Sequence, residues 1–425
     1  MPVPLGCPIQ VSPDLALPVD RGRARGAYPA LQNSAYFNYG AVGPLSKHAL
    51  AAISRAYELL ESFGPYSVEA NLWIEEEAAQ TRTLLETALN APAGSIALVE
   101  SICAACNVVL WGIDWRPGDH IVISGSENVG VAAIVQTVAE RFSLTVTRVS
   151  VTRALVEDPV REIERVLRPE TRLVVLSHIL QPTGEPMPIA GVVELCRSQP
   201  AASRPMLLVD GAQAVGAAPV SLHSLDPDFY AFTGSKWWCG PGGLAGLYIR
   251  PGLLDVLRPS FAGWRGLAHD RTGKARLHPD ARRFEMATSA YPLLAGLRAA
   301  VGLHAQAAGA DARRKAMLDT ARYFQGGLRS FPARAGVQIV PDTPGRESAS
   351  AIVSFAIRAT RPVELVRFLE ARQILIREID DPPCTRVCIH YLTTPEETNQ
   401  LLEAIGDFVA RKTTVTPRGS AIREK

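Results

Sequence analysis

The chain is organised around two neighbouring segments, V-D-G-A-Q-A-V-G (Val209–Gly216) and D-F-Y-A-F-T-G-S-K-W-W-C-G-P-G-G-L-A-G-L-Y-I (Asp228–Ile249). The apolar run before the first segment ends in an acid, Asp210, and Lys236 follows 26 residues later beside aromatic side chains. A lysine is normally hydrated and exposed, so neighbours that exclude water lower its pKa and leave a neutral, nucleophilic amine. Such a lysine on its own is more often a surface residue, but the acid upstream changes the interpretation.

A lysine and an acid in this arrangement meet the needs of a pyridoxal phosphate enzyme. The aldehyde of that cofactor requires an amine, and its pyridine nitrogen requires a carboxylate. The alternative for Asp210 is a plain acid at the end of a strand. The glycines after Lys236 do not follow the dinucleotide-binding pattern, so they predict a loop that supports the lysine.

Composition limits the class of protein. The 425 residues are enough for two domains, and 47% hydrophobic with 20% charged residues is typical of a well-packed globular protein. A net charge of +2 indicates no nucleic-acid partner and no anionic-membrane partner, and no apolar run is long enough to span a bilayer. The N-terminus lacks the pattern of a signal peptide, and seven scattered cysteines suit a reducing compartment, so we expect a cytoplasmic protein.

Two cysteine pairs, Cys103/Cys106 and Cys384/Cys388, could indicate metal or redox chemistry. Each pair lies among apolar residues and has no second ligand pair at zinc spacing. We therefore interpret them as buried structural cysteines and expect no metal site.

Short apolar runs alternate with helical patterns through the first two thirds of the chain. This alternation predicts a mainly parallel sheet with right-handed crossovers. Ser46 is placed to cap one helix. The expected strands are 96–99, 120–124, 145–149 and 173–176, followed later by 352–357 and 374–376; the expected helices include 68–89, 131–142, 362–372 and 395–410.

Several motifs occur in one order along most of the chain. They are Y-F-N-Y-G (36–40), V-L-W-G-I-D-W (109–115), L-S-H-I-L (176–180), Y-A-F-T-G-S-K-W (230–237), G-W-R (263–265), R-F-E-M-A-T-S-A-Y-P (283–292) and H-Y (390–391). With them the chain resembles the class V aminotransferase and cysteine desulfurase group of fold-type I pyridoxal phosphate enzymes. Within that group it is most similar to the cystine/cysteine C–S lyases of cyanobacterial type, and it also resembles lincosamide-type enzymes that process cysteine S-conjugates.

The resemblance implies an α/β fold of fold-type I. A large pyridoxal phosphate domain with a mainly parallel sheet is expected at residues 31–309, and a smaller α+β C-terminal domain at 310–411. Residues 1–30 are expected to form an N-terminal arm that packs with the smaller domain, and 412–425 a mobile tail.

The same resemblance assigns the cofactor contacts of the central stretch. Lys236 is expected to hold pyridoxal phosphate covalently, and Asp210 to pair with its pyridine nitrogen. Gln213 is expected near the 3-oxygen, and the hydroxyls of Thr233 and Ser235 near the phosphate. Ser235 stands where the family often has a histidine.

Other cofactor contacts depart from the family pattern. At the expected phosphate-binding helix start, Cys103 and Ala104 replace the usual hydroxyl residues, leaving backbone N–H donors. Asn128 stands where the family has a histidine over the cofactor ring; its alternative is a helix N-cap or turn residue. Gln181 is the nearest amide for the 3-oxygen in its loop.

Substrate and partner contacts follow by the same resemblance. Arg386 is expected to bind the α-carboxylate of an amino acid, and Arg377 a second carboxylate, with a surface salt bridge as its alternative. Asn38 is a candidate substrate contact or a turn residue. Thr288 and Trp264 match residues that reach the neighbouring subunit's site, which implies a homodimer with shared active sites.

The expected reaction is cleavage of a C–S bond in cystine or a cysteine S-conjugate, releasing a thiol or persulfide with pyruvate and ammonia. The altered cofactor contacts favour a specialised enzyme, such as one of antibiotic biosynthesis. Decarboxylation-coupled oxidative deamination, transamination and racemisation remain alternatives, because the same lysine, aspartate and arginine serve all of them. A non-catalytic descendant is opposed by the retained Lys236, Asp210 and Arg386. The sequence does not identify the native substrate, the role of Asn128 or an accessory protein.

Overall fold

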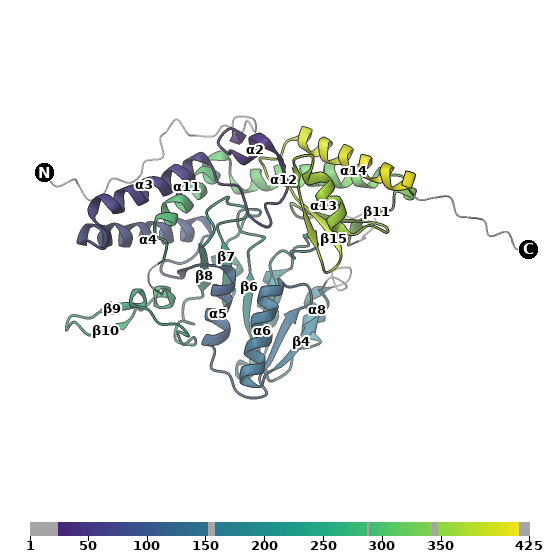
Figure 1. Cartoon of the computed structure of the whole chain (residues 1–425). Coiled ribbons are helices and arrows are strands. Elements are labelled where there is room, and N and C mark those ends of the chain that lie inside the picture. Colours follow the sequence, from purple (N-terminus) through teal and green to yellow (C-terminus); the bar gives the residue numbers. More distant parts are fainter. Residues whose placement is uncertain (1–23, 152–157, 287–288, 342–346, 416–425) are drawn as a thin grey trace, which may run out of the picture.

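The structure is a computed structural model that describes residues 24–151, 158–286, 289–341 and 347–415. Two main sheets form its body, a seven-stranded sheet and a four-stranded sheet that lies nearer the C-terminal helix (Figure 1). The predicted arm falls mostly outside the described residues. Its described end is fixed to the C-terminal region, because Arg25 forms an ion pair of 2.7 Å with Glu397.

The seven-stranded sheet is mainly parallel, as the alternation of strands and helices predicts. Its four parallel pairings join β4, β3, β5, β6 and β7, whereas β8 runs antiparallel to both of its neighbours. The strands lie in the order β2 (Ile96–Val99), β8 (Ala245–Ile249), β7 (Phe229–Thr233), β6 (Met206–Asp210), β5 (Thr171–Ser177), β3 (His120–Ser124) and β4 (Thr145–Val149).

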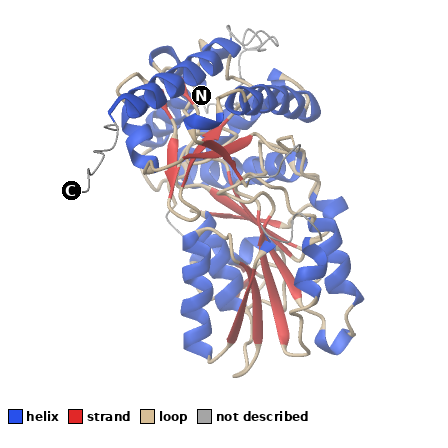
Figure 2. Ribbon diagram, turned by 90° about the vertical axis from the view of Figure 1, so that its right-hand side faces the viewer, coloured by secondary structure: helices blue, strands red, loops and turns tan. Residues whose placement is uncertain are grey.

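Helices cover both faces of this sheet (Figure 2). Successive strand residues point to opposite faces, so Ile121 and Ile123 join one buried cluster and Val122 joins the other. The first cluster includes α5 (Ile102–Gly112) and α6 (Val129–Phe142), and the second includes residues of α8 (Pro159–Glu164), α9 (Ile189–Ser198) and α11 (Pro292–Ala307). Both faces are therefore apolar, which is typical of parallel strands.

Two N-terminal helices pack against α11 beside the sheet. They are α3 (Lys47–Phe63) and α4 (Val68–Ala88), and each begins after a serine whose hydroxyl accepts from a backbone N–H. The predicted cap at Ser46 is confirmed, with its Oγ 3.1 Å from the amide nitrogen of Ala49. The close packing of α3 on α11 needs a small residue, since a Cβ at Gly296 would lie 2.5 Å from Ile53.

The second sheet is antiparallel, in the order β11 (Val337–Val340), β12 (Ile352–Ile357), β15 (Cys384–Cys388) and β14 (Arg377–Ile379). It packs with α12 (Ala310–Arg329), α13 (Pro362–Glu370) and α14 (Pro395–Val415), which all begin within the range expected for the smaller domain. The last helix continues to Val415, so the first residues of the predicted tail are helical.

The remaining elements are short. They are α2 (Ala30–Asn33), β1 (Ala35–Tyr36), η2 (Ala201–Ser203), α10 (Leu222–Leu225), η3 (Trp264–Gly266), β9 (Leu267–His269), β10 (Ala275–Leu277), η4 (Ala281–Phe284), η5 (Ala333–Ala335) and β13 (Ile374–Leu375). The β9–β10 hairpin projects from the body (Figure 1). Within the described ranges, no helix is both long and apolar enough to cross a bilayer.

Candidate active site

The candidate site lies where parallel strands of the large sheet end. Asp210 is the last residue of β6, and Lys236 lies three residues after the end of β7. The carboxyl ends of parallel strands meet at one edge of a sheet, which is where ligands bind in open α/β folds. The antiparallel strand β15 brings Arg386 to the same site, since the charges of both Asp210 and Arg386 influence the pKa of Lys236.

Lys236 is held in a crowded backbone setting. The amide N–H of Gly43 donates to the carbonyl of Ser235 at 2.7 Å, and a Cβ at Gly43 would lie 2.1 Å from the carbonyl oxygen of Lys236. Burial lowers the pKa of the Lys236 amine to about 8, although the nearby Asp210 carboxylate acts in the opposite direction. The expected desolvation of this lysine is therefore present in the structure.

We predict that Lys236 in the cofactor-free protein reacts with an amine-directed reagent at unusually low pH. Only a neutral amine attacks trinitrobenzenesulfonate, so labelling should rise through a midpoint near pH 8, whereas ordinary exposed lysines titrate near about 10.4. Peptide mass spectrometry across a pH series measures this, with the exposed Lys315 as the internal comparison. Identical profiles for the two lysines would contradict the prediction.

Asp210 is buried and makes a local hydrogen bond. Its Oδ1 accepts from the amide N–H of Ala212 at 2.8 Å. Burial raises the pKa of the Asp210 carboxyl, and the Lys236 charge and this hydrogen bond act against the rise. A cation brought to Asp210 would therefore stabilise its ionised form.

Gln213 connects the site to the N-terminal segment and to Trp237. Its Nε2 donates to the carbonyl oxygen of Gly40 at 2.9 Å, and its Oε1 accepts from the indole Nε1 of Trp237 at 3.0 Å. Trp237 directly follows the lysine, and its own carbonyl lies 3.1 Å from Nε2 of the buried His390. The amide plane of Gln213 is thus fixed by contacts on both sides.

Arg386 is almost fully buried, at 1% exposure, yet most of its donors are unused. Its Nη1 donates to the carbonyl oxygen of Gln181 at 3.3 Å, whereas Nε and Nη2 have no hydrogen-bond partner. A buried guanidinium without an anion is costly, so this arrangement fits a site for an anionic ligand. Two other predicted substrate contacts lie near Arg386. Arg377 is exposed and lies opposite Arg386 in the β14–β15 register. Asn38 forms an isolated parallel β-bridge with Cys388, and its buried Oδ1 has no hydrogen-bond partner.

Asn128 and Gln181 contact each other. The Nδ2 of Asn128 donates to Oε1 of Gln181 at 2.7 Å, and its Oδ1 caps α6 by accepting from the N–H of Gly130 at 2.8 Å. The N-cap alternative for Asn128 is thus realised, and both ends of its amide are already engaged. This hydrogen bond connects the loops that follow β3 and β5 at the candidate site.

The predicted phosphate-binding residues lie at the start of α5 and the end of β7. Ser101 caps α5 by accepting from the N–H of Ala104 at 3.1 Å, so this expected backbone donor is occupied. Cys103 is exposed, which corrects the interpretation of it as a buried cysteine; Cys106, Cys384 and Cys388 are buried. The hydroxyls of Thr233 and Ser235 lie 2.9 Å apart.

Of the two residues expected to reach a partner subunit, the structure describes only Trp264. Trp264 is 45% exposed, and the guanidinium carbon of Arg265 lies 4.9 Å from its ring centroid. Thr288 lies outside the described residues.

One acidic residue near the site was not predicted. Glu127 accepts hydrogen bonds from the backbone N–H of Ser177 at 2.7 Å and from its hydroxyl at 2.6 Å. Burial raises the pKa of the Glu127 carboxyl to about 8, and the Asp210 charge adds to the rise. A sequence signal was available, since G-S-E-N directly follows a buried strand, but the contact of Glu127 with the neighbouring strand depends on the sheet order.

The residues gathered here fit pyridoxal phosphate. They provide a partly desolvated amine, a buried carboxylate, a pair of hydroxyls and a guanidinium with unused donors. Among the described residues, no group of three or more His, Cys, Asp or Glu could hold a metal ion.

Comparison with known proteins identifies the relatives of this chain. The family model for aminotransferase class-V matches residues 35–397. The cystine C–S lyase C-DES, solved in complex with its reaction product cysteine persulfide, is 37% identical with a TM-score of 0.85, covering 89% of this chain and 99% of that chain. A C-DES mutant with glycine covalently linked to the PLP cofactor is 36% identical, with the same TM-score and coverage of 90% and 99%.

Curated proteins give a broader range of reactions. Isopenicillin N epimerase from Streptomyces clavuligerus is 28% identical over 395 residues, which is 87% of this chain and 93% of that protein. A probable cysteine desulfurase from Xylella fastidiosa (strain 9a5c) is 26% identical over 332 residues, covering 77% of this chain and 74% of that protein. The relatives therefore act on different substrates.

Proposed function

The chain belongs to the aminotransferase class-V family, and from this premise we propose that it is a pyridoxal phosphate-dependent C–S lyase. Its substrate is L-cystine or another cysteine S-conjugate. The similarity to C-DES over nearly all of both chains supports the reaction, and the buried Arg386 with unused donors is the observation that supports an amino-acid substrate.

Each group of the site has a separate task in this proposal. When bound, pyridoxal phosphate stores the electron pair that remains on the substrate after its α-proton is removed. Asp210 stabilises positive charge at the pyridine nitrogen, and Arg386 holds the α-carboxylate through paired hydrogen bonds. Lys236, with its lowered pKa, takes the α-proton and later returns a proton.

The products follow from elimination across the Cα–Cβ bond. The Cβ–S bond breaks with its electrons going to sulfur, which leaves as a persulfide from cystine or as a thiol from an S-alkyl cysteine. Water then replaces nitrogen in the remaining three-carbon fragment and gives pyruvate and ammonia.

The proposal is tested with purified holoenzyme and two substrates, L-cystine and S-methyl-L-cysteine. We expect pyruvate and a persulfide or thiol in equal amounts, measured by coupled reduction of pyruvate and by a thiol reagent. Substrate consumption that releases carbon dioxide and an aldehyde without pyruvate would instead establish decarboxylation-coupled oxidative deamination. A requirement for an α-keto acid acceptor would indicate an aminotransferase.

The similarity to isopenicillin N epimerase favours epimerisation as a second candidate. An epimerase also removes and returns an α-proton, but it leaves the β-substituent in place. Chiral chromatography of recovered substrate separates the two reactions, since the lyase consumes the amino acid and the epimerase only inverts it.

We also propose that the enzyme serves specialised rather than general metabolism. It is supported by Cys103 and Ala104 at the start of α5 and by the engaged amide of Asn128. A comparison of kcat/KM for cystine and for larger S-conjugates tests this, with a preference for the larger substrates expected.

We also propose that the active unit is a homodimer, with Trp264 and Thr288 reaching the partner's site. Apolar side chains are exposed on the projecting β9–β10 region, where Trp264 is 45% and Leu277 is 41% exposed. Exposed apolar residues gathered on a projecting hairpin are typical of a protein interface.

Light scattering is expected to give twice the mass of one chain. The double variant Trp264→Lys and Leu277→Lys should raise the dimer dissociation constant at least about tenfold, because two buried apolar contacts are replaced by charges. The exposed substitution Lys315→Gln, on α12, is the matched control and should leave the mass unchanged. A wild-type protein with the mass of one chain would contradict the proposal.

A further inference from the structure

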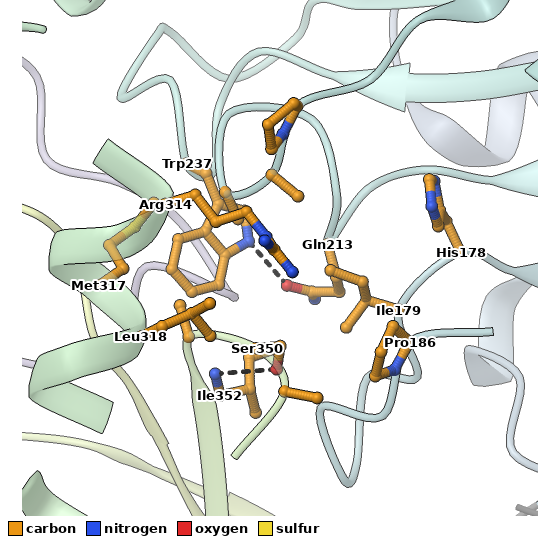
Figure 3. Close-up of a pocket in the computed structure, with 15 residues that line it drawn as sticks. His178, Ile179, Pro186, Gln213, Trp237, Arg314, Met317, Leu318, Ser350 and Ile352 are labelled. Carbon is orange, nitrogen blue, oxygen red and sulfur yellow. Dashed lines mark hydrogen bonds between the residues drawn. The ribbon is translucent and has the colours of Figure 1, made fainter. Parts of the chain in front are cut away.

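A separate cavity of about 280 Å³ lies behind Gln213 and Trp237 (Figure 3). Its walls come from the loop around Ile179, from the first turns of α12 and from the segment before β12. Pockets for drug-sized ligands usually measure about 300–1,000 Å³, so this cavity suits a smaller molecule.

The lining of this cavity has one charge. Among the described residues that line it, Arg314 is the only ionic one, and none is an aspartate or glutamate. Figure 3 shows the Arg314 guanidinium turned toward the Gln213–Trp237 hydrogen bond, with Met317 and Leu318 from the same helix on one side. No described acidic residue forms an ion pair with Arg314.

The polar groups on the opposite walls are neutral. Burial lowers the pKa of His178 to about 4, and its Nδ1 lies 2.8 Å from the Tyr230 hydroxyl, so the imidazole carries no charge at neutral pH. Most of the remaining lining is apolar, including Ile179, Leu318 and Ile352. An exposed arginine on the wall of a mainly apolar cavity complements a molecule with one anionic group and a short apolar body.

We propose that this cavity is a second binding site, which takes a small organic monocarboxylate whose carboxylate pairs with Arg314. The site is distinct from the amino-acid site at Arg386, and it lacks the lysine and the aspartate of that site. Gln213 and Trp237 form a wall of this cavity. Trp237 directly follows Lys236 in the chain, so a ligand here contacts the residue next to the catalytic lysine.

The proposal is tested by calorimetric titration of holoenzyme with 3-phenylpropionate, a monocarboxylate with a single ring. Arg386 also attracts carboxylates, so the titration is repeated on Arg386→Gln, in which only the second site remains. We expect binding to persist there, and the uncharged 3-phenylpropanamide to bind at least about tenfold more weakly, since a charge-assisted hydrogen bond is lost.

Two substitutions on α12 then locate the site. In the Arg386→Gln protein, Arg314→Gln should weaken 3-phenylpropionate at least about tenfold, whereas the adjacent Lys315→Gln should change it less than about twofold. If Arg386→Gln removes all binding, the acid occupies only the amino-acid site and the proposal is overturned. Equal affinity for the acid and the amide, or no effect of Arg314→Gln, overturns it as well. Neither outcome depends on turnover, so the proposed lyase reaction is judged separately.

Discussion

Replacing Lys236 with alanine is expected to lower kcat for L-cystine at least about 10⁴-fold. The substitution removes the amine that holds the cofactor and the base that takes the α-proton, and no other described lysine is within the candidate site. Asp210 and the hydroxyls of Thr233 and Ser235 remain, so we expect the cofactor to bind without a covalent link.

Three measurements separate a catalytic loss from a folding defect. Borohydride reduction followed by peptide mass spectrometry should attach the cofactor to Lys236 in wild type and leave the variant unmodified. Added methylamine should restore part of the activity of the variant, because a free amine can occupy the space of the missing side chain and take the proton. Lys315→Ala, an exposed lysine on α12, should keep full activity.

A result in which Lys236→Ala retains more than about a tenth of wild-type turnover would contradict the assignment of the lysine as the base. A reduced wild-type protein labelled at another lysine would contradict its assignment as the cofactor anchor. The two outcomes are independent, so the roles of Lys236 are tested one at a time.

The sequence was sufficient to predict the strand that ends at Asp210, whereas the strand Phe229–Thr233 before Lys236 was not among the predicted strands. The apolar run before Asp210 is long enough to be a strand and too short to be a helix, which places Asp210 at a strand end. The antiparallel direction of β8 was not predicted, because an apolar run has the same composition in either direction.

Contacts between distant segments could not be predicted from local patterns. Asn128 and Gln181 are 53 positions apart, and their hydrogen bond exists because β3 and β5 are neighbours in the sheet. Glu127 was missed for the same reason, since its partner Ser177 ends β5. The resemblance indicated which residue types belong to the site, whereas their mutual hydrogen bonds depend on strand order.

Arg386→Gln is expected to reduce kcat/KM for cystine about 10²–10³-fold, mainly by raising KM. Loss of one partner from a buried, hydrogen-bonded charge pair costs about 2–5 kcal/mol, and each 1.4 kcal/mol corresponds to tenfold in affinity. The substitution should not lower the free energy of unfolding of the free enzyme. Nε and Nη2 of Arg386 are buried without partners, so before substrate binds their desolvation destabilises the fold.

Thermal unfolding distinguishes a substrate-binding role of Arg386 from a merely structural one. We expect the Tm of Arg386→Gln, measured without substrate, to equal or exceed that of wild type while the KM rises. Arg377→Gln is the matched control, because Arg377 lies directly opposite Arg386 in the register but is exposed. It should affect cystine, which has a second carboxylate, more than S-methyl-L-cysteine, which has one.

A large fall in Tm together with an unchanged KM would mean that Arg386 serves the fold through its contact with Gln181 and not the substrate. The unused donors argue against that outcome. A structural arginine in a dry interior usually has every N–H satisfied, because each unmet donor costs free energy. An arginine that leaves Nε and Nη2 unmet in the absence of a ligand is instead prepared for a carboxylate that arrives with the substrate.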